Sequence, residues 1–394
     1  MNTGQRYRET ILFGNPDRIP LALGYPREST LRAWKSQGLD RPYTEALCEL
    51  LNVAPDAFLK FKNLEVNTRM IPEYEPVILE HKGGHYLVRD HMGATVEISD
   101  EFDPGYLRTA KDFVTRKWHK FPVENREDWL KMKTRYDPED PLRLPPEFRD
   151  SGADHAVGNR ASPGTGRLES GAGGGPDNRQ TLSGISFNGV FWQLREWCGM
   201  ENLCMMMLDD PDLVHEMTDF WADFISVILK KICARAALDH VFISEDMAYK
   251  AHSMISPAMT REFIMGAYLD WVPIIKNSGR PVIELDSDGC VDDLVPIWIE
   301  SGINCCSPVE VAAHCDILDY RRRYGKNMAY MQGIDKRIIA RGGKELERHV
   351  MAIVPEMFKL GGYIPGCDHG VPPDISWNNY ADFGRMIAKL SGWI

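Results

Sequence analysis

The sequence predicts an α/β protein whose strands form a parallel sheet. Beyond residue 180, strand-like and helix-like segments alternate at intervals of roughly 20 to 40 residues, which is typical of βα units. Several of these predicted strands also end in carboxylates. A (β/α)8 barrel and an open doubly wound sheet both fit the alternation. A barrel gathers chemistry from the ends of many strands, whereas an open sheet concentrates it at one switch point.

The first half of the chain is less regular. Residues 18–24 (RIPLALG) predict an early strand, and residues 85–99 predict a hairpin that turns at Gly93. Residues 138–180 are poor in large apolar side chains and dense in Gly, Pro and Asp. Such a composition cannot bury a core face, so we expect an exposed Gly/Pro-rich excursion within a single domain spanning residues 1–394.

The second half begins with a predicted strand at residues 184–192. A helical segment follows from residue 194 to 233 and breaks near Pro211, where Asp210 is the expected cap. Ser256 is the expected cap of a later helix. The other predicted strands lie within residues 239–247, 281–289, 303–310, 327–336 and 362–370.

Composition excludes several classes of protein. A net charge of −11 argues against a nucleic-acid or anionic-membrane surface. No apolar run approaches the roughly 20 residues that span a bilayer, and the N-terminus has no apolar core of a signal peptide. The nine cysteines are odd in number and contain no CxxC pair. We therefore expect a protein without a disulfide framework, located in the cytoplasm.

Carboxylates follow five consecutive predicted strands. Asp286 and Asp288 come directly after one apolar run, and Glu310 follows the next. The remaining polar residues at these strand ends are Glu245, Asp246, Lys250, Asp335, Lys336, Asp368 and His369. In a barrel these groups converge at one face. Each acid could instead only cap the helix that follows it. Acids that converge would repel, which raises their pKa values or requires a cation.

A metal is one interpretation of these acids. Asp286 and Asp288 lie on the same side of a strand, and His369 or Glu310 could complete a site for zinc or a harder divalent ion. Cys367 could add a thiolate, although a cysteine at this position is also typical of a buried core residue. The tentative metal ligands are therefore Asp286, Asp288, Cys367 and His369.

Two further side chains could contact a substrate. Trp192 lies at the end of a predicted strand and could line an aromatic pocket or belong to the core. Arg195 follows it and could hold a substrate carboxylate with its planar guanidinium. The same guanidinium could instead neutralise one of the acids. Both alternatives remain open at the level of the sequence.

The motifs of the second half resemble those of the uroporphyrinogen decarboxylase superfamily, and of its decarboxylase-like members in particular. They read, in order, ISEDMAYK, ISPAMTREF, DSDGC, SPVE, GIDKR and GGYIP followed by DHGVPPDIS and NY. RYRETILFGNPDRIPLAL at the start is similar to the opening helix and strand of that family. The resemblance implies a (β/α)8 TIM barrel with an N-terminal extension, a long Gly/Pro-rich insertion and a pocket at the carboxyl ends of its strands.

The resemblance implies two activities. Decarboxylases of the family carry an arginine-rich RQAGRY segment, whereas LALGYPREST here offers only Arg27. The other branch contains corrinoid-linked methyltransferases, and its coenzyme M enzymes hold zinc on an H-x-C motif. Asp286 and Asp288 stand where that motif would be, while Cys367 resembles the distant cysteine. Carboxylates are poor ligands for a thiol-activating zinc, so coenzyme M is not the expected substrate.

The expected function is therefore methyl transfer of the O-demethylase type, from a small methoxylated or methylated donor to cobalamin. The chain has no D-x-H-x-x-G cobalamin signature, so a separate corrinoid protein is the expected partner. Asp286, Asp288, Glu310 and His369 are the expected catalytic residues. The expected substrate-binding residues are Trp192, Arg195, Glu245, Asp246, Tyr249, Lys250, Asp335, Lys336 and Asp368.

Two alternative functions remain open at the level of the sequence. The first alternative is a decarboxylase or lyase of a carboxylated aromatic or tetrapyrrole. The second is a noncatalytic ligand-binding barrel. The oligomeric state is left open by the sequence; the resemblance makes a homodimer one candidate, since dimers are common among similar barrels.

Overall fold

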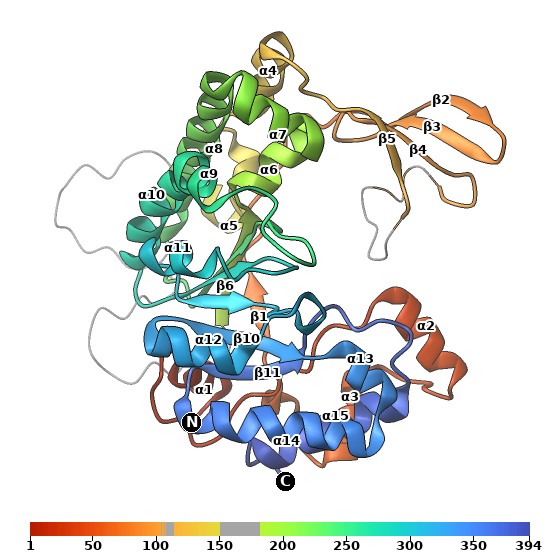
Figure 1. The fold of residues 1–394 in the computed structure, drawn as a ribbon, viewed down its shortest axis with the longest axis vertical. Helices are drawn as coiled ribbons and strands as arrows, with labels where there is room; N and C mark the ends of the chain where they lie inside the picture. Colours follow the sequence, from red (N-terminus) through yellow and green to blue (C-terminus); the bar gives the residue numbers. More distant parts are fainter. Residues whose placement is uncertain (104, 106, 108–113, 150–181) are drawn as a thin grey trace.

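The computed structural model describes residues 1–103, 105, 107, 114–149 and 182–394. Figure 1 shows a body of helices around a sheet, from which a small antiparallel sheet projects. Both termini lie at the end of the body away from this projection. Most of the predicted excursion, residues 150–180, lies outside the described residues.

The centre of the body is a parallel sheet of seven strands in the order β1-β6-β7-β8-β9-β10-β11. This sheet confirms the α/β prediction. Its strands are β1 (Phe61–Asn63), β6 (Leu182–Asn188), β7 (His240–Ser244), β8 (Val282–Asp286), β9 (Cys305–Ser307), β10 (Ala329–Ile334) and β11 (Tyr363–Cys367). Each neighbouring pair is parallel, so all the carboxyl ends meet at one edge.

An eighth strand is not formed as a ladder. The predicted strand at residues 18–24 makes an isolated parallel bridge from Leu21 to Phe58, and the chain just beyond it makes another from Pro26 to Val371. The segment thus contacts both edges of the curled sheet. The prolines in this segment have no backbone N–H to donate, which explains why the segment forms no continuous ladder of hydrogen bonds with the sheet.

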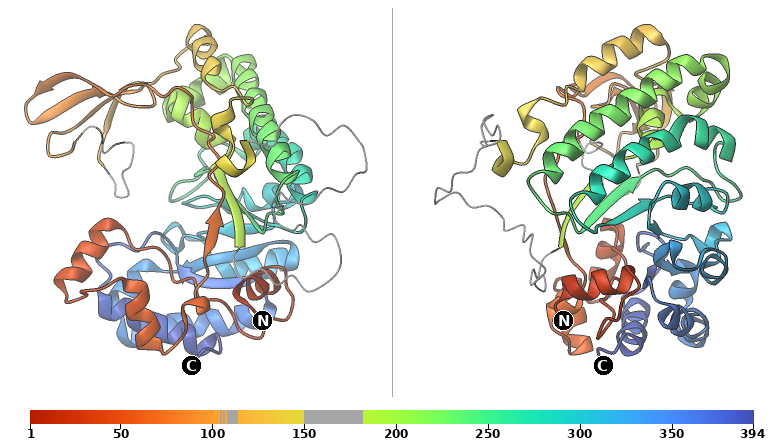
Figure 2. Two further views of the ribbon diagram at one scale, coloured as in Figure 1. Left: turned by 180° about the vertical axis from the view of Figure 1, so that it is seen from behind. Right: turned by 90° about the vertical axis from the view of Figure 1, so that its left-hand side faces the viewer.

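Fifteen α-helices in the described part of the chain cover the sheet. They are α1 (Thr3–Ile11), α2 (Glu28–Ser36), α3 (Tyr43–Leu51), α4 (Arg126–Met132), α5 (Pro146–Arg149), α6 (Val190–Cys198), α7 (Met200–Asp209), α8 (Pro211–Cys233), α9 (Pro257–Met259), α10 (Met265–Lys276), α11 (Val295–Glu300), α12 (Ile317–Tyr324), α13 (Lys336–Arg341), α14 (Gly343–Leu360) and α15 (Trp377–Leu390). Figure 2 shows the long helices α8 and α10 side by side.

Local signals explain where several helices begin. The Asp210 carboxylate accepts a hydrogen bond from the Leu213 N–H at 3.1 Å, and Pro211 occupies the first turn of α8. The Ser256 hydroxyl accepts from the Met259 N–H at 3.1 Å at the start of α9. Both predicted caps are confirmed.

The projecting sheet contains β2 (Val77–Lys82), β3 (His85–Arg89), β4 (Thr95–Ser99) and β5 (Lys117–Lys120) in that order, all antiparallel. Strands β3 and β4 confirm the predicted hairpin. Gly93 has a φ of +90° in the connection, which a side chain would disfavour.

The start of the predicted excursion is partly buried. Residues 138–149 include helix α5, and Arg143 and Phe148 are buried. The Arg143 guanidinium donates to four backbone carbonyls, those of Asn67, Arg69, Arg135 and Asp137. Tertiary contact with other loops therefore buries a stretch whose composition predicts exposure.

Replacing this arginine tests its structural role. We expect Arg143→Met to lower the free energy of unfolding by about 3 kcal/mol, because the carbonyls lose a buried charged donor. Urea unfolding measures the change. Arg322→Met, at a side chain 68% exposed, is the matched control and should change stability by less than about 1 kcal/mol. Equal effects of the two substitutions would contradict the assignment.

All nine cysteines lie among the described residues, and none is in a disulfide. No helix in the described ranges combines the length and apolar character needed to cross a bilayer.

Candidate functional site

A row of polar side chains crosses four neighbouring strands at their carboxyl ends. Asn188 pairs with Ser244, Ser244 with Asp286, and Asp286 with Ser307. Paired residues of adjacent strands point to the same face of a sheet. This polar row, Asn188–Ser244–Asp286–Ser307, therefore lines one face at the end where active sites of such sheets lie.

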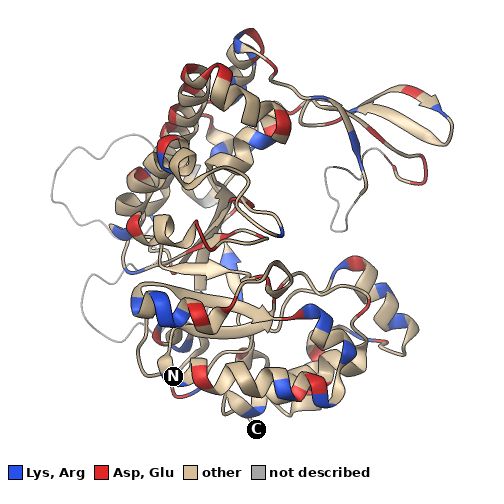
Figure 3. Ribbon diagram, viewed as in Figure 1, with Lys and Arg blue, Asp and Glu red and all other residues tan. Residues whose placement is uncertain are grey.

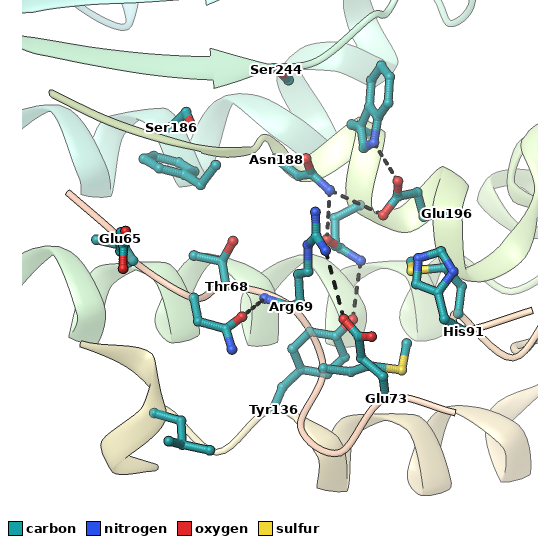
Figure 4. Close-up of a pocket in the computed structure, with 18 of the residues that line it drawn as sticks. Glu65, Thr68, Arg69, Glu73, His91, Tyr136, Ser186, Asn188, Glu196 and Ser244 are labelled. Carbon is teal, nitrogen blue, oxygen red and sulfur yellow. Dashed lines mark hydrogen bonds and ion pairs between the residues drawn. The ribbon is translucent and has the colours of Figure 1, made fainter. Parts of the chain in front are cut away.

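A cavity of about 870 Å³ adjoins the polar row (Figure 4). Asn188 and Ser244 belong to its wall, together with Trp192 and Glu196 of α6. The opposite wall comes from the loop before β2 and from Tyr136. The charged and polar side chains labelled in Figure 4 include Glu65, Thr68, Arg69, Glu73, His91 and Ser186.

Glu196 is one of the cavity carboxyl groups, with Glu65 and Glu73, that the sequence did not reveal. Its side chain accepts hydrogen bonds from the Trp192 indole at 2.8 Å and from the Asn188 amide at 3.2 Å. Burial raises the pKa of Glu196, and the indole hydrogen bond partly opposes that shift. Its spacing from Trp192 is one helical turn, which is a weak signal because most such pairs are structural.

Asp286 differs from every other acid at the strand ends. Among the described residues, none donates a hydrogen bond to its carboxyl group. Burial raises the pKa of Asp286 well above its usual range, and the charges of Asp288, Glu284 and Asp246 raise it further. The Asp286 carboxyl group is therefore more readily protonated than a solvent-exposed aspartic acid. Its neighbour Ser307 is 1% exposed, and the Ser307 hydroxyl has no hydrogen-bond partner in the described part of the chain.

Asp288 and His369 form a second unit. Asp288 Oδ2 lies 2.9 Å from His369 Nε2, and Arg27 Nη2 lies 3.1 Å from His369 Nδ1. Asp288 is 41% exposed and His369 19% exposed. Three segments far apart in the sequence thus meet beyond the carboxyl ends of the strands, at the mouth of the site. Figure 3 shows the acidic positions that gather in the loops leaving these strands.

Arg195 neutralises an acid, which decides between the two alternatives left open by the sequence. Its guanidinium donates to the Asp246 carboxylate at 2.8 Å and to the Asp246 carbonyl at 3.0 Å, and it stacks 4.6 Å over the Trp192 ring. Burial raises the pKa of Asp246, and Arg195 opposes the shift. Trp192 lies inside α6 rather than at a strand end, because β6 stops at Asn188.

Glu245, an expected substrate-binding residue, is held by hydrogen bonds at the start of α6. Its carboxyl group is fully buried and accepts from three successive N–H groups, those of Val190, Phe191 and Trp192, at 2.9, 2.8 and 3.2 Å. The Tyr268 hydroxyl also donates to it at 2.6 Å. Burial raises the pKa of Glu245 to about 7 despite these bonds. Glu245 therefore caps the start of α6.

Asp335 and Asp368 are also held by hydrogen bonds. Asp335 accepts from the Arg337 N–H at 2.8 Å at the start of α13 and pairs with the Arg337 guanidinium. Asp368 is fully buried and accepts from the N–H groups of Val311 and Lys336, both at 2.9 Å. Burial raises the pKa of Asp368 to about 6. Both carboxyl groups thus already accept hydrogen bonds within the protein, and their expected role in substrate binding stays a prediction.

The remaining predicted residues surround a smaller cavity. Its volume is about 350 Å³, and its lining includes Tyr249, Lys250, Asp288 and Glu310. Glu310 accepts from the Lys336 ammonium at 2.8 Å and from the Gly289 N–H at 3.0 Å. Glu310 and Lys336 therefore form an ion pair beside Asp288 rather than two separate ligand-binding groups.

The tentative metal ligands do not come together. Cys367 is fully buried in the main hydrophobic cluster with Tyr380. Ile364, three residues earlier on β11, belongs to the separate cluster that contains Val282. Alternation along the strand therefore turns Cys367 away from the face that carries Asp286. The described residues contain no group of three or more His, Cys, Asp and Glu side chains placed to hold a metal ion.

Comparison with known proteins places this geometry in a family. Residues 195–390 match the family model described as Uroporphyrinogen decarboxylase (URO-D). The matched range contains strands β7 to β11 and every loop that carries a predicted catalytic residue.

Two relatives share part of their sequence with this chain. They are the proteins named uroporphyrinogen decarboxylase from Pseudomonas fluorescens (strain SBW25) and Pseudomonas entomophila (strain L48), which are 24% and 23% identical over 230 residues. These alignments cover 54% of this chain. The chain spans only 61% and 62% of the length of the two relatives.

A solved structure extends the likeness over the whole fold. A methyltransferase from Methanosarcina mazei superposes with a TM-score of 0.58 at 11% sequence identity, covering 99% of each chain. At this identity the likeness concerns the fold. The family model confirms, over residues 195–390, the resemblance to uroporphyrinogen decarboxylases that the motifs of the second half predicted.

Proposed function

We propose that this protein is a methyltransferase of the O-demethylase type, which moves a methyl group from a small methoxylated or methylated donor to a corrinoid on a separate protein. The observation that supports this proposal is the state of Asp286. Its carboxyl group has no hydrogen-bond partner in the described ranges, and burial keeps its pKa well above the usual value. A carboxyl group that retains its proton can serve as a general acid.

The donor would occupy the larger cavity. A volume of about 870 Å³ is within the usual range for a small-molecule site. Asn188 and Ser244 offer hydrogen bonds at the wall next to Asp286, and Trp192 and Tyr136 offer aromatic surface. This arrangement would orient a methoxy oxygen toward the polar row.

The proposed methyl transfer needs a proton at the leaving oxygen of the donor. The corrinoid supplies the nucleophile that accepts the methyl carbon when it is bound. The carbon–oxygen bond of the donor breaks, and its electron pair stays on the oxygen. Asp286 passes its proton to that oxygen, so an alcohol or phenol leaves and the Asp286 carboxylate takes up a proton from water. Protonating the leaving oxygen avoids a high-energy alkoxide.

The mouth of the site would admit a partner protein. Tyr249 is 52% exposed and Asp288 41% exposed at the rim of the smaller cavity. The residues present do not fit a zinc site, because Cys367 faces the core.

A spectroscopic assay tests the proposal. The purified protein is mixed with cob(I)alamin and a panel of methoxylated and methylated donors, and methylcobalamin is followed by its absorbance. We expect methylcobalamin to form together with one equivalent of demethylated product. Folded protein that transfers no methyl group from any donor, to free cobalamin or to a corrinoid protein, would contradict the proposal.

Decarboxylation is the second candidate, because the matched family and both relatives carry that name. A protonated Asp286 could also protonate carbon after loss of carbon dioxide. The cations at the mouth disfavour a polycarboxylate, since Arg195 pairs with Asp246 and Lys336 with Glu310. Release of carbon dioxide from a carboxylated aromatic or tetrapyrrole, without methyl transfer, would favour the decarboxylase. Ligand binding with neither reaction would favour the noncatalytic barrel.

A further inference from the structure

The contact between Arg27 and His369 determines which ring nitrogen of the histidine carries a proton. Arg27 Nη2 lies 3.1 Å from His369 Nδ1, and His369 Nε2 lies 2.9 Å from Asp288 Oδ2. A guanidinium group has only donors and stays charged in proteins. His369 Nδ1 must therefore accept, so the imidazole is neutral and its proton sits on Nε2. That N–H donates to the Asp288 carboxylate.

The backbone holds Arg27 and His369 in this arrangement. The Arg27 N–H donates to the Val371 carbonyl at 3.2 Å, and the Val371 N–H donates to the Tyr25 carbonyl at 2.8 Å. These bonds are the parallel bridge that joins the segment around Pro26 to the loop after β11. Arg27 also begins α2 as its N-cap residue. Both partners of the contact are thus placed by secondary structure rather than by mobile side chains alone.

The same contact explains a charge pattern at the mouth. A neutral ring donates one hydrogen bond to Asp288 without cancelling its charge. The Asp288 charge is the second contribution, after burial, that raises the pKa of Asp286.

We propose that Arg27 is a positioning residue, which holds His369 as an Nε2–H donor and thereby orients an ionised Asp288 next to the acid Asp286. The role of this chain of contacts in turnover rests on the proposed methyl transfer. The ring tautomer does not rest on it. The sequence shows Arg27 only as the single arginine where decarboxylases of the family carry an arginine-rich segment.

Nuclear magnetic resonance of protein labelled with ¹⁵N and ¹³C in its histidine rings tests the tautomer directly. His369→Gln identifies the His369 signals by their loss. At neutral pH we expect His369 to be a neutral ring with an unprotonated Nδ1 and a proton on Nε2. A proton on Nδ1, in either the neutral or the charged ring, would overturn the inference.

Substitution of the arginine adds a second readout. In Arg27→Met, Nδ1 loses its donor, so we expect the single tautomer to give way to a mixture or to an imidazolium. Arg27→Lys should restore part of the wild-type signature, since an ammonium also donates. Arg385→Met, at a surface arginine paired with Asp382, is the matched control and should leave the His369 signals unchanged. An unchanged His369 signature in Arg27→Met would overturn the inference.

Measuring the rate of methyl transfer distinguishes a failure of this inference from a failure of the proposed function. If methyl transfer occurs, Arg27→Met should lower its rate about tenfold or more, because the acid loses its oriented neighbour. If His369 has the expected tautomer but the protein transfers no methyl group, the positioning geometry stands and the proposed function is wrong. If the protein transfers methyl groups but His369 has the other tautomer, the proposed function stands and the positioning inference is wrong.

Discussion

Asp286→Asn should lower the rate of methyl transfer by about 10²- to 10⁴-fold, while the protein stays folded. The amide has nearly the same shape but no acidic proton, and a general acid typically contributes an effect of this size. Stability should hold, because no described residue donates a hydrogen bond to the Asp286 carboxyl group and the amide adds no buried charge.

Single-turnover transfer to cob(I)alamin measures this effect. The matched control is Asp270→Asn, at an exposed position of α10, which should transfer at the wild-type rate. If Asp286→Asn transferred within about threefold of the wild type, the general-acid role would be excluded.

The pH dependence gives an independent check. The Asp286 carboxyl group must be protonated to act, and burial raises its pKa well above the usual value. Activity should therefore be present at neutral pH and fall as the pH rises through this raised pKa. The falling limb should be absent in Asp286→Asn, since an amide does not titrate. A wild-type profile that rises over this range would point to a general base instead.

Glu245→Ala should cause the largest loss of stability, about 4 kcal/mol in the free energy of unfolding. The substitution removes the acceptor of three N–H groups at the start of α6 and of the Tyr268 hydroxyl, all in a buried environment. Each buried donor left without a partner costs roughly 1–3 kcal/mol, and the contributions are not additive. Urea unfolding, with a matched slope for both proteins, measures the change.

Two further substitutions make this prediction specific. Glu300→Ala removes a surface carboxylate that is 53% exposed and paired with Arg261, so it should change stability by less than about 1 kcal/mol. Gly189→Ala should be strongly destabilising, because the added carbon would lie 2.1 Å from the Glu245 carboxyl carbon. If Glu245→Ala resembled Glu300→Ala, the capping role would be wrong.

Local patterns in the sequence were sufficient for the framework. The βα alternation, the caps at Asp210 and Ser256 and the hairpin before Ser99 all depend on residues close together in the chain. The family motifs identified the superfamily for the same reason, since each motif is a short continuous stretch. The acids at residues 246, 286 and 288 do act on one another electrostatically, as convergence of the strand ends predicts.

The roles of individual acids could not be predicted from such local sequence patterns. Glu245, Asp335, Asp368 and Asp286 all follow a strand, yet three of them accept hydrogen bonds from helix starts and only Asp286 is left without a described donor. What separates them is whether an N–H group from another part of the chain comes within reach. The cavity wall likewise combines residues near 65–73 with Tyr136 and Glu196.

Short-range sequence patterns were therefore sufficient to predict the strands, the helix caps and the family resemblance. The pattern of a strand or helix is contained within a few neighbouring residues. The choice of acid, the outward turn of Cys367 and the Arg27–His369 contact came from packing between segments up to 342 residues apart. Burial and hydrogen bonding set the protonation of a carboxyl group, and both are properties of its surroundings in space.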